Sequence, residues 1–460
     1  PSEIVLQCKK VFKNIVAYDR FDFDAKKESM YALRPAFDAV AEMLGRGEKV
    51  PESLLEVFSQ ITEYSAKMDS LKNARDKVPF KINESQNAER LFGGNLSISA
   101  SQLEKFNLCR FSYFCNYGLN VRERQRAEIN PMQYGTIVHY ILERFFREYS
   151  KEQYSVMDED ELSKIFSTYI SEYAAAHFGE VQTKQNSFMY RIKLILENVL
   201  RLVKHTIDEL TQSEFFVTDC ELKIGEDVPS YTVVLPDGHK IAVCGSVDRV
   251  DIMQKNGTTY LRVIDYKTGS KEFKLSDVLY GINLQMLLYL HSIEVSGSDR
   301  YGDIIPAGIL YMPATVPYIS SDSLKSIDKL PDELNKKLKM NGLLLKDTEI
   351  IHGMDKTDAA TYIPVKIKAG EPVSSTSLAT LEEFGKIFQK VDMLIAEMGK
   401  NIYNGNIEAR PLKGGHDSCE YCPYDSVCAY RRSNPINCFS VDNKTVIEEI
   451  TNEINGKEEE

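Results

Sequence analysis

The sequence lacks the long apolar segments and the leader that would direct a protein into or across a membrane. No apolar run approaches the roughly 18 residues that a membrane-spanning helix needs. The opening residues, PSEIVLQCKKVFKN, contain no apolar core of a signal peptide. We therefore expect a cytoplasmic protein with no membrane association. An initiating Met is also lacking, and we expect the chain to be a fragment of a longer protein.

A net positive charge is lacking as well. The 460 residues include 56 Lys and Arg but 68 Asp and Glu, for a formal net charge of −12. This balance argues against a nucleic-acid binder whose whole surface is basic. It does not exclude a nuclease, because a metal site and a local groove attract phosphate even in acidic surroundings. Part of the excess lies in an acidic tail over 436–460, whose end we expect to be solvated or disordered.

The content of hydrophobic residues, 43%, is enough for a substantial core. Residues 1–92 carry apolar positions at spacings of three and four, which predicts helices, and they contain no motif with chemistry. Gly93 and Gly94 break this pattern, and we expect a second domain over 93–435. Residues 315–374 are less regular and rich in Lys and Asp, which suggests an insertion at the edge of that domain.

The candidate catalytic residues lie between residues 243 and 289, where two strand-like runs precede an amphipathic helix. The first run bears Asp248 in GSVDRVD, and the second bears Asp265 and Lys267 in VIDYKTG. Because strand side chains alternate with period two, Asp265 and Lys267 project from one face. Gln285 and Tyr289 are four apart and share one face of the helix.

These residue types suit metal-dependent attack on a phosphodiester. Asp248 and Asp265 supply the oxygen ligands that a hard divalent cation prefers. The cation lowers the pKa of bound water, and Lys267 can orient that water or stabilise developing charge. An isolated D-x-K is usually a solvated ion pair. The preceding Asp, the hydrophobic entry and the following helix favour the catalytic interpretation here.

Aromatic and basic residues alternate in SQLEKFNLCRFSYFCNYGL, a predicted helix with Ser101 and Glu104 as its capping box. Such a segment can stack bases along a single strand, but we expect its aromatic residues to be core. The arginines at 122, 124 and 126 are better candidates for contact with DNA.

Nine cysteines without a secretory signal do not indicate a disulfide framework. Cys419, Cys422 and Cys428 follow a C-x2-C-x5-C pattern, which indicates a soft-metal site one ligand short of a tetrahedral set. The fourth ligand can be His416, Cys438 or a distant cysteine. Chemistry alone leaves zinc and an iron–sulfur cluster open, with zinc slightly favoured by the spacing.

The order G-x-V-D, V-I-D-Y-K-T-G, Q-x-x-x-Y resembles the RecB-type branch of the PD-(D/E)xK nuclease superfamily. The resemblance implies an α/β fold with a mixed sheet flanked by helices, plus additional helical regions. It implies metal ligation by Asp248 and Asp265, a catalytic Lys267, and auxiliary roles for Gln285 and Tyr289. The family's metal-binding His in G-x-x-x-H matches His139 in GTIVH. An acidic residue often stands at the position of Glu221, where a simple ion pair is an equal alternative.

Iron–sulfur members of this family take one cysteine from before the nuclease core and three from after it. The resemblance therefore implies a structural 4Fe–4S cluster on Cys109, Cys419, Cys422 and Cys428, with Cys115 as the competitor of Cys109. Over about residues 90–435 the pattern is most similar to the AddB (RexB) family of nuclease domains. That family implies an AddA-type helicase–nuclease partner and a preceding helicase-like region, of which residues 1–92 would be the end.

The expected function is Mg²⁺- or Mn²⁺-dependent exonuclease action on single-stranded DNA ends, within an ATP-dependent helicase–nuclease complex that processes double-strand breaks. One alternative is a free-standing iron–sulfur exonuclease similar to those that process DNA for CRISPR adaptation. Another is a catalytically silent DNA-binding or assembly subunit.

Overall fold

The computed structural model describes residues 3–458 except for 13–30, 47, 76–80, 123–130, 178–185, 270–271, 316–329, 358, 375, 429 and 431–434. The chain forms two compact units, Pro1–Pro79 and Phe80–Glu460. Among the described residues, no helix combines the length and the apolar character that crossing a membrane requires. Two of the arginines that we expect to contact DNA, at positions 124 and 126, lie outside the described residues.

The first unit is helical, as its apolar spacing predicts. Its helices are α1 (Glu3–Val11), α3 (Leu33–Gly45), α4 (Glu52–Gln60) and α5 (Thr62–Arg75). Phe37, Phe58 and Tyr64 form its aromatic core, with ring centroids 4.7 to 5.5 Å apart. No cluster of catalytic residue types accompanies this core within the described residues.

The second unit is built around a six-stranded mixed sheet with the strand order β11-β8-β7-β6-β5-β2. The strands β5 and β6 form an antiparallel hairpin whose turn residues, Asn256 and Gly257, have φ of 52° and 83°. Asn and Gly tolerate this left-handed conformation and favour such tight hairpins. The strands β6 and β7 are parallel. The bounds are β2 Phe216–Ile224, β5 Gly245–Lys255, β6 Thr258–Lys267, β7 Ile304–Pro313, β8 Asn341–Leu345 and β11 Leu378–Ala379.

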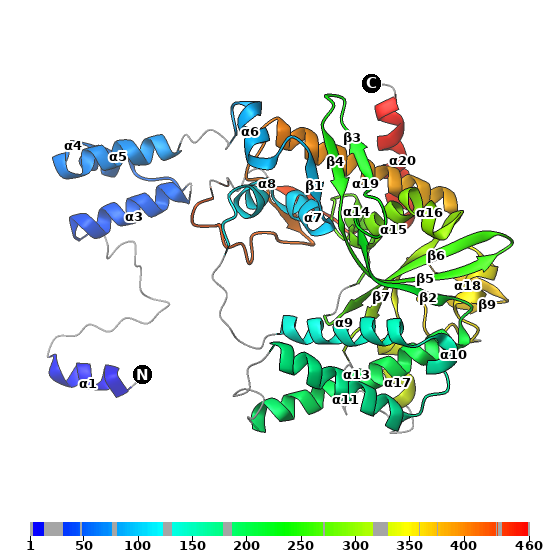
Figure 1. The fold of residues 1–460 in the computed structure, drawn as a ribbon. Helices are drawn as coiled ribbons and strands as arrows, with labels where there is room; N and C mark the ends of the chain where they lie inside the picture. The colour runs from blue at the N-terminus through cyan, green and yellow to red at the C-terminus, as the bar shows by residue number, and fades with distance from the viewer. Residues whose placement is uncertain are drawn as a thin grey trace. The chain divides into compact units, whose positions relative to one another are not determined.

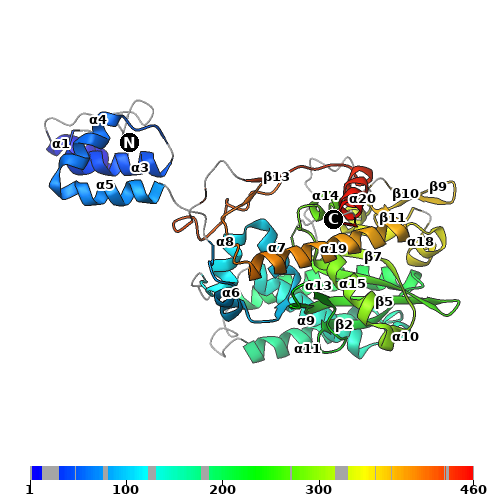
Figure 2. The same cartoon turned by 90° about the horizontal axis from the view of Figure 1, so that it is seen from above.

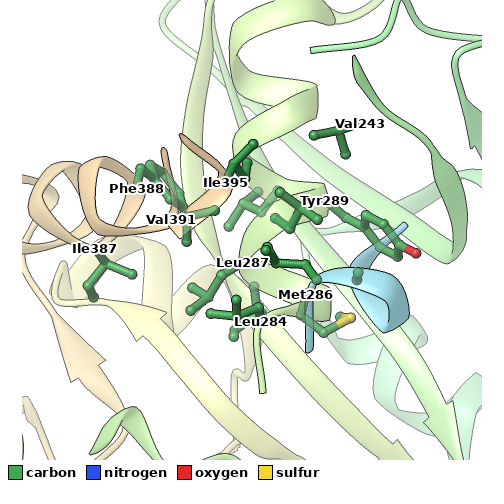
Figure 3. Close-up of a cluster of buried hydrophobic side chains, with 14 of the residues drawn as sticks. Val243, Leu284, Met286, Leu287, Tyr289, Ile387, Phe388, Val391 and Ile395 are labelled. Atoms are coloured by element: carbon green, nitrogen blue, oxygen red, sulfur yellow. The ribbon is translucent and has the colours of Figure 1, made fainter. Parts of the chain in front are cut away.

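Helices cover both faces of this sheet, which gives three layers (Figures 1 and 2). The helices α9 (Pro131–Glu148), α11 (Glu159–His177) and α13 (Asn186–Gln212) pack on one face. The helices α15 (Gln285–Ser296) and α19 (Leu381–Tyr403) pack on the other, where Figure 3 shows their interdigitated side chains. The expected mixed sheet flanked by helices is therefore confirmed.

A second, three-stranded sheet has the order β1-β4-β3, with β1 at Leu96–Ile98, β3 at Thr232–Val234 and β4 at Lys240–Val243. A hairpin through Asp237 and Gly238 joins β3 to β4. The run IAVCGSVDRVDI is divided at Cys244 into two strands, because β4 pairs with β1 and β3 while β5 pairs with β2 and β6.

Residues 315–374, the expected insertion, supply one strand of the central sheet. The described part contains α17 (Leu330–Leu338), β8, α18 (Thr348–Met354), β9 (Lys366–Lys368) and β10 (Glu371–Val373). Because β8 lies between β7 and β11, this segment is integral to the sheet rather than only packed against its edge.

The acidic tail is helical over most of its length, so the expectation of a disordered end was wrong, whereas the described acidic side chains are exposed to solvent as expected. Helix α20 (Asn443–Glu458) buries Val446 and Ile450 completely in the main core. Its apolar residues recur at helical spacing and pack on α19, where Lys390 also pairs with Glu453. The acidic side chains occupy the remaining faces.

Candidate functional site

Three carboxylates lie side by side on adjacent strands β2, β5 and β6. The register that pairs Cys220 with Arg249 places Glu221 opposite Asp248. One step beyond the end of the β5–β6 ladder, Asp265 lies opposite Asp248. Side chains directly opposite each other on neighbouring strands share a face at a separation of about 5 Å. The three neighbouring strands therefore bring their acidic groups close together on the sheet.

Glu221 occupies an unusual backbone conformation at this point, with φ of +49°. A residue other than glycine in this region costs on the order of 1–3 kcal/mol, and such strain concentrates at functional sites. Ser246 Oγ donates a hydrogen bond of 2.7 Å to Glu221 Oε2 and holds the carboxylate in place.

His139 on α9 completes a group of three ligand atoms with these carboxylates. Its Nδ1 lies 3.5 Å from Glu221 Oε1 and 3.5 Å from Asp248 Oδ2. Ligand atoms of these three residues all lie within 4.8 Å of one another. The His139 Nε2 is 3.2 Å from the carbonyl oxygen of Tyr266, and donation there leaves Nδ1 directed at the carboxylates. Two carboxylates and one imidazole fit Mg²⁺ or Mn²⁺.

Burial and the close spacing of the charges shift the pKa values of His139, Glu221 and Asp248. Burial and the neighbouring charge of Asp265 raise the pKa of Asp248 to about 7. Burial lowers the pKa of His139, but the hydrogen bond to Glu221 and the charges of both carboxylates outweigh it and raise that pKa to about 9. The same hydrogen bond lowers the pKa of Glu221. Without a cation these groups share protons, so cation binding would release protons.

Asp265, Lys267 and Gln285 form a second group beside the first. Lys267 Nζ lies 2.6 Å from Asp265 Oδ2, which confirms the prediction that the two side chains share a face. Gln285 Nε2 donates to Asp265 Oδ1 at 3.0 Å, and Lys267 Nζ donates to Gln285 Oε1 at 3.3 Å. Gln285 therefore ties the carboxylate and the ammonium together. Asp265 does not belong to the His139 group, where Glu221 stands instead.

Tyr289 lies one helical turn beyond Gln285 and is 6% exposed. Figure 3 shows it among the buried side chains of α15. A side chain at Gly245 would collide with the Tyr289 ring, so glycine is needed where β5 begins. Burial raises the pKa of Tyr289, and the charges of Asp265 and Asp248 raise it further. The phenol therefore stays protonated beside the carboxylates.

Glu104 is a residue of this region that the sequence pattern assigned incorrectly. The capping box of α7 (Ala100–Leu108) consists of Ser99 and Gln102, not Ser101 and Glu104, because the helix begins two residues earlier than predicted. The Glu104 carboxylate instead accepts hydrogen bonds from the backbone at the start of α15. No local sequence signal indicates a cap supplied by a distant segment.

The aromatic residues that accompany α7 are core, as expected, and not a base-stacking surface. Phe106, Phe111 and Tyr113 are between 3% and 5% exposed. Arg110 lies over the ring of Phe106 and pairs with Glu397 at 3.2 Å.

All four cysteines predicted to bind a cluster line one cavity of about 280 Å³, formed where the segment after α19 returns to α7 and α8 (Arg110–Tyr113). Burial raises the pKa of Cys109, and it raises the pKa of Cys428 to about 11. A soft cation that favours thiolate would offset this. Cys115 packs beside Cys109 but does not line the cavity. The other open candidates lie elsewhere: Cys438 packs with Leu412, and His416 pairs with Asp277.

Four thiols around one cavity are a donor set that suits either a tetrahedral zinc ion or an iron–sulfur cluster.

Comparison with known families agrees with this geometry. Residues 97–429 match the model of the PD-(D/E)XK nuclease superfamily. The match covers well over half of the 460 residues, and the chain therefore belongs to this superfamily of nucleases.

Similar full-length relatives are bacterial proteins whose names describe a subunit of an ATP-dependent helicase/deoxyribonuclease. The protein of Clostridium acetobutylicum is 31% identical over 456 residues, which cover 94% of this chain and 39% of the relative. That of Clostridium botulinum strain Loch Maree is 32% identical over 462 residues, 94% of this chain and 39% of the relative. That of Thermoanaerobacter sp. strain X514 is 29% identical over 474 residues, 98% of this chain and 41% of the relative. The chain spans about two fifths of the length of these relatives.

Proposed function

We propose that this chain is the nuclease part of an ATP-dependent helicase–deoxyribonuclease that digests single-stranded DNA ends during double-strand break processing. An AddA-type helicase–nuclease subunit would be its partner. The observation that carries the proposal is the pairing of a three-ligand group, His139, Glu221 and Asp248, with an adjacent group formed by Asp265 and Lys267 of β6 and Gln285 of α15. The names of the relatives support the choice of DNA as substrate.

In this proposal His139, Glu221 and Asp248 hold a Mg²⁺ or Mn²⁺ ion, and Asp265 adjoins it on the lysine side. The bound cation lowers the pKa of water and neutralises charge on the phosphate. Lys267 orients the attacking water or stabilises charge on the phosphate oxygens, and Gln285 fixes the ammonium while it does so. Tyr289, a protonated phenol, can donate a hydrogen bond to the substrate.

The test is an exonuclease assay on the purified chain with end-labelled single-stranded DNA and Mg²⁺ or Mn²⁺. Asp265→Asn should lower the cleavage rate by at least a hundredfold, because it removes the charge that binds Lys267. Asp299→Asn, on the exposed helix α16 (Ser298–Tyr301), is the matched control and should cleave at the wild-type rate. Digestion by Asp265→Asn at the control's rate, or no digestion by the wild type, would overturn the assignment.

We further propose that Cys109, Cys419, Cys422 and Cys428 hold a 4Fe–4S cluster in a structural role. The support is the shared cavity, which all four thiols line. Metal analysis of protein purified without oxygen should give about four irons per chain. One zinc per chain without iron, in protein never exposed to oxygen, would contradict the cluster and leave the nuclease proposal untouched.

A further inference from the structure

A large basic groove opens beside Lys267. Its volume is about 910 Å³, near the upper end of the roughly 300–1,000 Å³ of pockets that enclose drug-sized ligands. Its walls come from the ends of β6 and β7 and from α17, β8, β9 and β10. The lining includes six lysines, namely Lys267, Lys336, Lys337, Lys339, Lys366 and Lys368. Among the described residues of the lining, Glu272 is the one that is acidic.

This excess of positive charge stands out in a chain with a net charge of −12. Five of the six lysines belong to the insertion, 315–374, and the sixth is Lys267 itself. The insertion therefore does more than complete the central sheet with β8. It places a band of ammonium groups at the mouth of the proposed catalytic site.

Two of the lysines are only partly exposed and make close contacts within the protein. Lys267 pairs with Asp265, as described above. Lys339 Nζ donates to the carbonyl oxygens of Ala360 and Val365, at 2.6 and 3.1 Å, and so anchors the segment that leads into β9. Burial lowers the pKa of Lys339, as expected of an ammonium with a structural role.

The other four lysines are exposed. Lys366 and Lys368 lie two apart on β9, so their side chains project to the same side, while Ile367 between them packs on the core. Glu371 lies opposite Lys368 in the β9–β10 hairpin. Its carboxylate accepts a hydrogen bond of 2.6 Å from Thr348 Oγ1.

Lys336 and Lys337 end α17 on another wall of the groove. Lys336 forms an ion pair of 2.7 Å with Glu333 in which the side chains are 70% and 38% exposed. Such solvated pairs contribute little and yield readily to a stronger anionic ligand.

We propose that this groove binds the phosphate backbone of single-stranded DNA on one side of the bond that is cut, and guides the strand to Lys267. The proposal rests on the nuclease function proposed above. Lysine binds phosphate as a mobile point charge and reads no base. Among the described lining residues the lysines far outnumber the aromatic ones, of which Tyr311 is the one that is described, so the groove is suited to phosphate rather than to base stacking. Binding in the groove is therefore independent of sequence and sensitive to salt.

The experiment compares the double variant Lys366→Gln/Lys368→Gln with a control, Lys204→Gln/Lys444→Gln, which removes the same charge from exposed positions outside the groove. Binding of a fluorescent oligothymidylate is followed by anisotropy without divalent cation, over a range of salt concentrations. Each lost phosphate contact lowers the slope of log K against log salt by about 0.7 for single strands. The double variant should therefore lose about 1.4 from the slope and on the order of tenfold in affinity.

Digestion of single-stranded DNA provides the second measurement. The double variant should raise KM several-fold with a smaller effect on kcat, because lost backbone contacts weaken substrate and transition state alike. Lys336→Gln/Lys337→Gln, on another wall of the groove, should act in the same direction. Agreement between the two double variants would exclude a folding defect in β9 as the cause.

The outcomes separate the two proposals. If the wild type digests DNA and the groove variants match the control in affinity and salt slope, the groove assignment is wrong and the nuclease stands. If both variants weaken binding but the wild type digests nothing, the groove stands and the nuclease proposal fails. An equal or larger loss for duplex DNA would overturn the assignment to single strands.

Discussion

Glu104 on α7 caps the first turn of α15 through its side chain. Its Oε1 accepts hydrogen bonds from the backbone N–H groups of Leu284 at 2.8 Å and Gln285 at 3.3 Å, from a position 180 residues away from Leu284. Gln285 in turn bridges Asp265 and Lys267. Five residues after Glu104, at the end of α7, stands Cys109 of the cysteine cavity. One carboxylate therefore links the cysteine cavity to the proposed catalytic group.

We predict that Glu104→Ala lowers kcat by roughly ten- to a hundredfold with little change in KM, because a small displacement of Gln285 misplaces the lysine. The loss of a cap should also cost about 1 kcal/mol of stability. Glu104→Gln should recover much of the rate, since its amide oxygen can accept the same two hydrogen bonds. Steady-state kinetics on single-stranded DNA measure each effect.

Glu383→Ala is the matched control, because Glu383 also caps a long helix. Its carboxylate accepts a 2.7 Å hydrogen bond from the backbone N–H of Thr380 at the start of α19. This variant should lose similar stability and keep the wild-type kcat. Equal losses of kcat in the two variants would mean that Glu104 acts only through global stability.

The sequence predicts those parts of the site that depend on local periodicity. Asp265 and Lys267 share a face because strands alternate, and Gln285 and Tyr289 share a face because helices repeat every 3.6 residues. These relationships need no knowledge of which strands are neighbours. The mixed sheet flanked by helices, in contrast, was expected from the family resemblance.

The remaining parts depend on contacts between distant segments. The sequence leaves Glu221 undecided, because its place beside Asp248 depends on the register of β2 and on its positive φ. The cap from Glu104 and the burial of Val446 in α20 depend likewise on tertiary packing. Cys109 was placed with the later cysteines by family resemblance and not by spacing.

A second carboxylate in GSVDRVD, Asp251, is structural rather than catalytic. It lies on the α13 side of the sheet, where its Oδ2 accepts hydrogen bonds from Arg249 at 2.8 Å and Arg262 at 3.0 Å. Glu209 of α13 pairs with both arginines, and all four side chains are completely buried. The four charges balance one another in a site that water does not reach.

We predict that Asp251→Asn destabilises the protein by about 3–5 kcal/mol, because it leaves an uncompensated positive charge in the interior. Denaturant unfolding measures the loss. Glu226→Gln, which breaks the exposed pair between Glu226 and Lys223, should cost less than about 1 kcal/mol. At a temperature where Asp251→Asn remains folded, its cleavage rate should equal that of the control; a loss as large as that of Asp265→Asn would make Asp251 catalytic.

The cysteine cavity makes a further prediction about stability. Cys422→Ser should lose the bound iron and lower the melting temperature together, because the cluster would close a loop of roughly three hundred residues between Cys109 and Cys419. By analogy with a long-range cross-link, that closure contributes on the order of 5 kcal/mol. Cys115→Ser should keep the iron. If Cys115→Ser lost the iron and Cys109→Ser retained it, Cys115 and not Cys109 would be the fourth ligand. If Cys422→Ser lost the iron without a change in melting temperature, the cluster would have no structural role.

His291 on α15 predicts a pH dependence of stability outside the proposed site. Its Nε2 lies 3.2 Å from Asp392 and its Nδ1 3.3 Å from Glu294, while its ring stacks on Phe388. Burial lowers the pKa of His291, but the hydrogen bonds to the two carboxylates outweigh it and raise that pKa to about 9. A group whose pKa is higher in the folded state binds its proton more tightly there, so protonation stabilises the fold.

The stabilisation from His291 should therefore be complete below about pH 6.5, the pKa of an unfolded histidine, and should disappear as the pH rises through about 9. We expect it to reach on the order of 2–3 kcal/mol. The measurement is the free energy of unfolding of the wild type minus that of His291→Gln, at pH 6 and at pH 10, which cancels other titrating groups. The difference should shrink by that amount between the two pH values; a constant or growing difference would show that the imidazole is neutral in the folded protein.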